Sequence, residues 1–362
     1  MASELDTQQN ADAIIGACTY HRSEFDSVLI KTPESKLQAQ AASLQTAFEA
    51  SASSGLGVLD RFPDELTLLI LRELDLVSYL RFRRVNNRAR VLATSSREYK
   101  AIAKHGLEGL KPLLKAQLGH LFTVTDFYKA LSSPNCKFCG KFAPFLFLLS
   151  CTRCCFTCLQ ISSATRVLSV PVSTTFAKAV KLPKKHLEEE FGPKLRVVYG
   201  KYTLETWPKV KTPRYLVLEK NAKETLVSLG LSQAAAKRAV QLQPEHQEHN
   251  DIRHLYCYRY MSATAFPWLD PSRDKVERGV SCKGCQFRVE EYVGNNFPMM
   301  EPPWGFNDRD RIYSADEFLY HFRSCAHAKK VWDDSQGGTV VQESDFTREG
   351  GIIAIQHRYE LD

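Results

Sequence analysis

The chain has 362 residues, of which 44% are hydrophobic and 25% are charged, so it is long enough for two or three domains with substantial cores. This composition is close to the average for globular proteins and excludes a wholly disordered chain or a fibrous protein. The net charge of +7 is unevenly distributed, because residues 176–215 carry ten Lys or Arg and four Glu.

The longest nearly uncharged apolar stretch, residues 142–150, is about half as long as a membrane-spanning helix. The first residues have neither the basic flank nor the apolar core of a secretion signal. We therefore expect an intracellular protein of the cytoplasm, the nucleus or both, with no membrane partner. Because thiols stay reduced there, the eleven cysteines need an explanation other than disulfides. Ten of them lie between Cys136 and Cys325, mostly in Cys-x-x-Cys spacings, which indicates metal binding.

Residues 1–55 are rich in Ala, Ser, Gln and Thr, and only residues 37–48 show a helical period. This pattern predicts a mobile arm that could form a transient helix. The composition changes at Leu56 to a stretch rich in apolar residues, and we place the start of an ordered domain there.

A helix is predicted after Pro63, which suits a first helical turn, and Asp64 and Glu65 complement the positive end of the helix dipole. Its apolar residues recur at helical spacing on more than one arc: Leu66, Leu69, Ile70 and Leu74, then Leu68 and Leu71. A short helix in a small bundle can bury only one face against its own neighbours. The surplus leucines require either another protein to cover them or burial all round in a larger core.

The order of these residues resembles the F-box family over roughly residues 56–102. The resemblance rests on Leu59-Asp-Arg-Phe-Pro63-Asp-Glu-Leu66, on the leucines that follow, and on Arg84-Val85-Asn86-Asn87-Arg88. It implies a three-helix bundle that binds a Skp-type adaptor and so attaches the chain to a cullin ubiquitin ligase. The residues expected at or behind the docking surface are Leu59, Phe62, Pro63, Leu66, Leu69, Ile70, Leu80 and Val85. Phe62 stands where the family usually has Leu, and Ala89 where it often has Trp; both keep the pattern apolar.

Five arginines, Arg81, Arg83, Arg84, Arg88 and Arg90, alternate along the same segment. They could contact phosphates. A solvated face of the last F-box helix is the favoured interpretation, because the apolar residues between them supply a buried side.

A first metal site is predicted from Cys136-Lys-Phe-Cys139-Gly140, a spacing that allows a tight turn with backbone N–H groups directed at the sulfur atoms. An apolar stretch at residues 142–149 can form a strand before the cysteines at 151, 154, 155 and 158. Tetrahedral zinc needs two more ligands, so either Cys151 with Cys154 or Cys155 with Cys158 completes the site. We favour Cys155 and Cys158, because a helix beginning there would present both thiolates from its first turn. A cysteine that is not used would be a reserve ligand or would pack as a small hydrophobic residue.

A second site is predicted from Cys282-Lys-Gly-Cys285 and a later helix that Ser314 and Glu317 would start as a capping box. His321 and Cys325 are four residues apart and so project from one face of that helix. Cys282, Cys285, His321 and Cys325 thus form a Cys3His set, with His327 a weaker rival to His321. Cys257 is expected to pack, and Cys18 to be without a metal.

The order of an F-box, two cysteine pairs and an apolar strand also resembles fungal F-box proteins of unassigned substrate, to about residue 230. Four protein ligands leave no open position, so both zinc ions would be structural rather than catalytic. No phosphate loop, nucleophile elbow, carboxylate pair or open metal site is recognisable, and we expect no enzymatic activity.

The basic residues 176–215 contain a predicted hairpin, with strands at residues 194–199 and 202–206 around Gly200 and Lys201. Tyr199, Tyr202, Trp207 and Tyr215 could let bases or acidic peptides stack beside the lysines, although a plain soluble surface is favoured. Two short helices are expected at residues 223–229 and 232–240, and strands at 339–341 and 352–356.

Together these patterns predict a mainly α protein with small β elements (α+β). Its predicted parts are an arm (1–55), an F-box bundle (56–105), a first zinc-stapled region with the basic hairpin (106–245), and a second zinc-stapled region with a tail (246–362). The favoured function is a substrate-recruiting subunit of a cullin-type (SCF) ubiquitin ligase, whose remaining part binds an unidentified protein target. The alternatives are a zinc-dependent nucleic-acid-binding protein that uses residues 176–215, and an F-box scaffold that acts without degradation.

Overall fold

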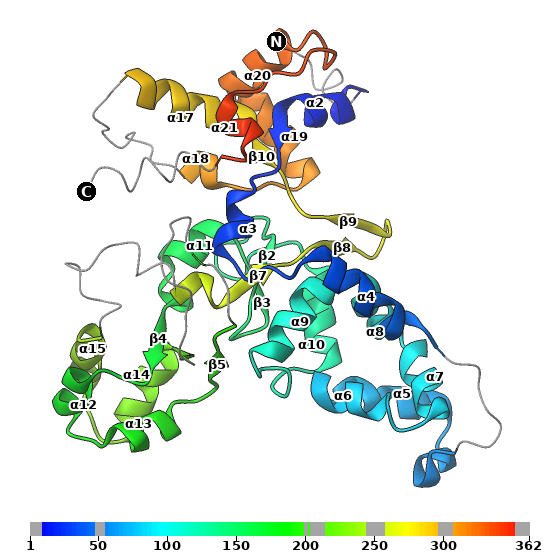
Figure 1. The fold of residues 1–362 in the computed structure, drawn as a ribbon, viewed down its shortest axis with the longest axis vertical. Helices are drawn as coiled ribbons and strands as arrows, with labels where there is room; N and C mark the ends of the chain where they lie inside the picture. Colours follow the sequence, from blue (N-terminus) through cyan, green and yellow to red (C-terminus); the bar gives the residue numbers. More distant parts are fainter. Residues whose placement is uncertain are drawn as a thin grey trace.

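The computed structural model describes residues 9–47, 55–198, 202, 214–243, 258–295 and 307–351. Helices dominate, and the strands form small antiparallel sheets, which confirms the predicted mainly α fold with small β elements (Figure 1). No helix in the described ranges is both long and apolar enough to cross a membrane.

Three short helices follow a 3-10 turn, η1 (Gly57–Arg61), and form the predicted bundle: α5 (Asp64–Glu73), α6 (Leu76–Phe82) and α7 (Asn87–Ser95). Asp75 begins α6 by accepting hydrogen bonds from the N–H groups of Val77 and Ser78. Asn86 begins α7 in the same way through the N–H of Ala89. These side chains satisfy N–H groups that have no partner inside the helix, so they fix where each helix starts.

The largest core joins this bundle to three further helices and a sheet. The helices are α8 (Arg97–His105), α9 (Leu107–Lys115) and α10 (Val124–Ser132), the last starting with a capping box of Thr123 and Asp126. The sheet has the order β3–β2–β7, from Thr152–Cys154, Phe145–Phe147 and Ala263–Ala265, with Phe145 opposite both Cys154 and Ala265. A strand from beyond residue 245 therefore completes the sheet of the first predicted zinc region.

Arg153 lies in the middle of this core and is only 2% exposed. Its guanidinium donates hydrogen bonds to five backbone carbonyls from three separate segments: those of Ala130, Leu131, Ala143, Phe266 and Pro267. Burial lowers the pKa of Arg153 to about 9. The side chain ties α10, the loop before β2 and the end of β7 together.

A second core lies within residues 167–243, which we name the basic module. Its sheet has the order β4–β6–β5, from Val167–Val170, Tyr215–Leu218 and Leu195–Arg196. Its helices are α12 (Thr174–Val180), α13 (Lys184–Glu190), α14 (Glu219–Ser228) and α15 (Gln233–Gln241). The last two confirm the predicted pair of short helices, including the Ser232 cap. The described strand of the predicted hairpin, β5, pairs with β6, whereas residues 199–201 and 203–206 lie outside the described residues.

The prediction of a mobile arm is wrong for residues 9–47, which pack against the rest of the chain. They form α2 (Ala11–Cys18), β1 (Thr19–Tyr20), α3 (Glu24–Val28) and α4 (Glu34–Gln45). Ile14 and Cys18 are 2% and 0% exposed, and β1 pairs with β10 (Ser281–Cys282). Long-range burial outweighs the weak local pattern that suggested an arm.

The arginine run is not a simple solvated face either. Arg83 is buried, and both Arg83 and Arg90 donate to the carbonyls of Ser43 and Thr46. The last carbonyls of a helix have no partner within it. These two arginines therefore bind the end of α4 to the three-helix bundle.

Five further helices gather near α2 at one end of the molecule (Figure 1). They are α17 (Lys283–Asn295), α18 (Asn307–Asp310), α19 (Ala315–Ser324), α20 (Ala326–Asp334) and α21 (Asp345–Arg348). A hairpin of β8 (Trp268–Asp270) and β9 (Lys275–Glu277) leads to them. The strand predicted at 339–341 is absent, because these residues form a turn and a bend after α20, and residues 352–356 lie outside the described residues.

Candidate functional site

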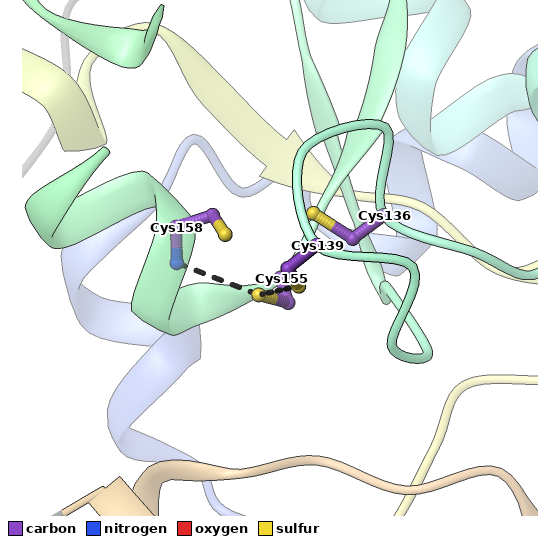
Figure 2. A group of neighbouring side chains, drawn as sticks. All are labelled: Cys136, Cys139, Cys155 and Cys158. Carbon is purple, nitrogen blue, oxygen red and sulfur yellow. Dashed lines mark hydrogen bonds between the residues drawn. The ribbon is translucent and has the colours of Figure 1, made fainter. Parts of the chain in front are cut away.

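Four cysteines from two separate segments meet beside the central sheet. The sulfur atoms of Cys136, Cys139, Cys155 and Cys158 all lie within 4.8 Å of one another, and those of Cys139 and Cys155 are 3.6 Å apart. Figure 2 shows Cys136 and Cys139 on one loop and Cys155 and Cys158 at the start of the helix α11 (Phe156–Ile161). A tetrahedral ion with metal–sulfur distances of about 2.3 Å places its sulfur ligands about 3.8 Å apart. This group has the spacing and chemistry to hold a metal ion.

Local backbone structure explains how each pair presents its sulfurs. The loop closes where the Cys136 carbonyl accepts from the N–H of Gly140, whose φ of +74° favours glycine. In the second segment the N–H of Cys158 donates to the sulfur of Cys155, which stands at the N-cap of α11. The predicted helix start at this pair is therefore present.

The two alternate cysteines are not part of the group. Cys151 is buried in the main core at a φ of +49°, and burial raises its pKa. Cys154 is fully buried in β3, and the adjacent Cys136 together with burial raises its pKa. Conversely, hydrogen bonds from Cys154 and Cys155 lower the pKa of Cys136. The Cys154 thiol donates to the carbonyl of Cys155, and the lowered pKa of Cys136 favours the thiolate form that binds metal.

The second predicted set is also brought together. One ligand atom from each of Cys282, Cys285, His321 and Cys325 lies within 4.8 Å of the others. The sulfur of Cys285 is 3.3 Å from Nε2 of His321 and 4.0 Å from the sulfur of Cys325. Hydrogen bonds from Cys282 and Cys285 lower the pKa of Cys325, which favours its thiolate form. Three sulfurs and one imidazole nitrogen at these separations could hold a metal ion.

The imidazole of His321 is oriented by a neighbour that the sequence did not reveal. Its Nδ1 lies 3.3 Å from the hydroxyl of Tyr313, and the two rings stack with centroids 4.6 Å apart. The rival, His327, lies outside the group with its Nε2 3.6 Å from a carboxylate oxygen of Glu291. No local pattern marks Tyr313 as a partner of His321, because Tyr313 lies eight residues earlier, just before the Ser314 cap of α19, where helical spacing does not apply.

The elements around the second group differ in part from the prediction. Cys285 lies in the first turn of α17 rather than in a loop, and the N–H of Cys285 donates to the sulfur of Cys282. Ser314 caps α19, but the Glu317 carboxylate accepts from the N–H of Phe142 instead of closing a capping box. Cys18 packs in the same small core and donates to the carbonyl of Ala328. Cys257 lies outside the described residues.

The F-box bundle has an exposed apolar face. Leu66, Leu69 and Ile70 on α5 are 47%, 53% and 47% exposed, whereas Thr67 and Leu71 on the opposite side are buried. Phe62, Pro63 and Val85 extend the exposed surface, and Leu59 and Leu80 are half-buried behind it. We name these eight residues the α5 face. The alternative for this helix was burial on all sides within a larger core. The exposure of Leu66, Leu69 and Ile70 excludes that alternative for the isolated chain.

Comparison with known families agrees with this geometry. Residues 59–101 match the family model of the F-box domain, and no curated protein or solved structure matches the chain. The match begins in η1 and continues over α5, α6, α7 and part of α8, and it includes all eight residues of the α5 face. The chain therefore contains an F-box domain, which indicates a Skp-binding adaptor role in SCF-type ligases.

Proposed function

We propose that this protein is the substrate-recruiting subunit of a cullin-type ubiquitin ligase in the cytoplasm or the nucleus. The α5 face binds a Skp-type adaptor, and through it a cullin, while the rest of the chain holds a protein target. The protein itself performs no chemistry. It acts by raising the local concentration of target lysines near the ubiquitin-transferring partners.

The exposure of Leu66, Leu69 and Ile70 carries this proposal. Half-exposed large aliphatic residues on consecutive turns of one helix are unfavourable in water, at about 25 cal/mol for each Å2 of apolar surface. Contiguous exposed apolar surface of this kind marks a protein interface. The bundle is otherwise well packed, with Leu71, Leu76 and Leu92 buried, so the exposed face is not a consequence of loose folding.

Zinc in both cysteine groups would give the target-binding part its rigidity. The donor sets, four sulfurs in one group and three sulfurs with one imidazole in the other, are typical of structural zinc. A filled four-ligand site leaves no position for substrate, and its binding energy contributes directly to folding.

Co-expression with a Skp-type adaptor tests the proposal. The wild-type chain should co-purify with the adaptor, and the double variant Leu66→Asp, Ile70→Asp should not, because two carboxylates would be buried in the interface without partners. Ile161 and Val341 are exposed apolar residues elsewhere, at 64% and 70%. The matched variant Ile161→Asp, Val341→Asp should keep the adaptor. Retention of the adaptor by the α5 variant, with circular dichroism unchanged, would remove the ligase assignment.

A further inference from the structure

The basic module carries more positive charge than the entire chain. Residues 167–243 contain fourteen Lys or Arg and six Glu, a net charge of +8, whereas the whole chain carries +7, so the remaining residues sum to −1. The positive net charge of the chain therefore resides in this stretch of sequence, and the remaining residues are nearly neutral as a whole. An uneven charge distribution bears on which partners a protein binds and how fast it associates with them, and not on its fold.

Much of this charge is exposed and without a carboxylate partner. Lys178 on α12, Lys237 and Arg238 on α15, and Lys181 and Arg196 in the neighbouring loop and strand are exposed. Within the described ranges of the chain, none of these five has a carboxylate oxygen within 4 Å. By contrast, Lys185, Lys220 and Lys223 pair with glutamates on their own helices. The exposed set thus offers cations that no carboxylate of the described residues neutralises.

The placement of the module leaves it accessible while the F-box is occupied. Helices α12 and α15 pack against each other and lie with α13 and α14 at one end of the molecule, away from α5, α6 and α7 (Figure 1). The α5 face and the exposed cations can therefore bind different partners at the same time.

The described aromatic residues of the module do not offer a stacking surface. Phe176, Phe191 and Tyr202 are buried, and Tyr215 packs against the module's core. Recognition of single-stranded nucleic acid relies on exposed aromatic rings as well as on charge. A partner recognised by charge alone fits the described surface better.

We propose that the basic module binds an acidic segment, rich in Asp and Glu, of the protein target. This inference rests on the proposed function, which requires a protein target, and it specifies the chemistry of that target. Charge complementarity at an exposed surface accelerates encounter and excludes cationic partners, and it weakens as salt is added.

Fluorescence anisotropy of the intact chain tests the inference, with a labelled peptide composed of Glu, Gly and Ser as the acidic probe. The same peptide with Gln in place of each Glu is the neutral probe. The Glu peptide should bind at low salt and the Gln peptide should not. The variant Lys178→Glu, Lys237→Glu, Arg238→Glu should weaken binding at least about tenfold. Lys36, Lys129 and Lys330 are exposed cations on α4, α10 and α20, and the variant with all three changed to Glu has the same net charge. That variant should bind within about twofold of the wild type, because exposed charges farther away than the screening length contribute little.

Three outcomes would overturn the inference: no binding of the Glu peptide at low salt, equal weakening by both charge variants, or tighter binding of a DNA duplex than of the peptide. Adaptor co-purification, measured on the same proteins, separates this result from the proposed function. A charge variant that loses the peptide but keeps the adaptor supports the inference. Adaptor co-purification of the variant Leu66→Asp, Ile70→Asp tests the ligase assignment and has no bearing on the binding of the acidic peptide.

Discussion

The hydroxyl of Tyr313 lies 3.3 Å from Nδ1 of His321, on the far side of the imidazole from the cysteine sulfurs. Tyr313 is 1% exposed and stacks on the ring, so the imidazole is held from two directions. A neutral histidine that binds metal through Nε2 carries its proton on Nδ1, and this N–H can donate to the phenol oxygen. Contacts of this kind select the tautomer and the ring orientation of a metal ligand.

Tyr313→Phe should therefore weaken metal binding at the second group by about tenfold or more and leave the first group unchanged. Competition with a chromophoric chelator can resolve the two affinities. Tyr320 is 76% exposed on α19, and Tyr320→Phe should have no effect. Equal affinities for wild type and Tyr313→Phe would show that the hydroxyl does not orient the ligand.

Cys151 and Cys155 have opposite expected roles in metal binding. Metal analysis should return about two zinc ions per chain, and Cys155→Ser should reduce this to about one, because the first group would lose a ligand. Cys151→Ser should keep two ions, since its sulfur is outside the group. A chelator should unfold the protein, as followed by near-ultraviolet circular dichroism. A metal-free chain with an unchanged spectrum would contradict both site assignments.

Arg153→Met should lower the free energy of unfolding by at least about 3 kcal/mol, because several buried carbonyls would lose their donor. Arg153→Lys should recover only part of this, since an ammonium has three donors and no planar fork. Arg166 is exposed nearby, and Arg166→Met should change stability by less than about 0.5 kcal/mol. Denaturant unfolding measures all three, and a mild effect of Arg153→Met would show that water replaces the guanidinium.

Gly284 allows α17 and α20 to approach closely. A Cβ at this position would lie 2.2 Å from the backbone N of Ala328, which cannot move independently of α20. Gly284→Ala should therefore destabilise the fold and weaken the second metal site. Gly16 lies in α2 with no atom within 4 Å of such a Cβ, so Gly16→Ala should raise stability by roughly 0.5–1 kcal/mol. Thermal melting should give a lower melting temperature than wild type for Gly284→Ala and a higher one for Gly16→Ala.

Asp75 should make the F-box bundle sensitive to acid. Burial raises the pKa of its carboxyl, but the hydrogen bonds from Ser78 and Val77 outweigh this effect and hold the pKa below 3.8. Its stabilisation is therefore fully present above pH 3.8 and is lost as the pH falls through the lower, folded-state pKa. Asp75→Ala should cost about 1 kcal/mol at neutral pH. Asp75→Asn keeps an acceptor and should flatten the acid limb of the stability profile. An unaltered acid limb in this variant would assign the effect to another carboxyl.

Local patterns in the sequence predicted much of the candidate site. Cys155 and Cys158 could be chosen over Cys151 and Cys154 because a helix start presents two thiols three residues apart on one side. His321 and Cys325 could be paired because residues four apart share a helix face. Likewise, the exposed Leu66 and Ile70 follow from a helical period that leaves more leucines than a small bundle can bury.

Other features depend on contacts between distant segments. Residues 9–47 have a composition that suggested an arm, but Ile14 and Cys18 are buried beside Cys282 and Cys285. Nothing in the sequence around Arg153 indicates that it is buried. It lies in the core because three distant backbone segments meet there and present carbonyls to its guanidinium.

The sequence by itself determined the helix starts, the ligand pairs and the apolar α5 face, since each depends on residues within a few turns of one another. Tertiary structure alone decided that α2 packs beside the second group of candidate ligands, that β7 completes the central sheet, and that the basic module lies apart from the F-box. The physical reason is that burial and backbone pairing between distant segments outweigh local preferences, and their energies cannot be read from any one segment.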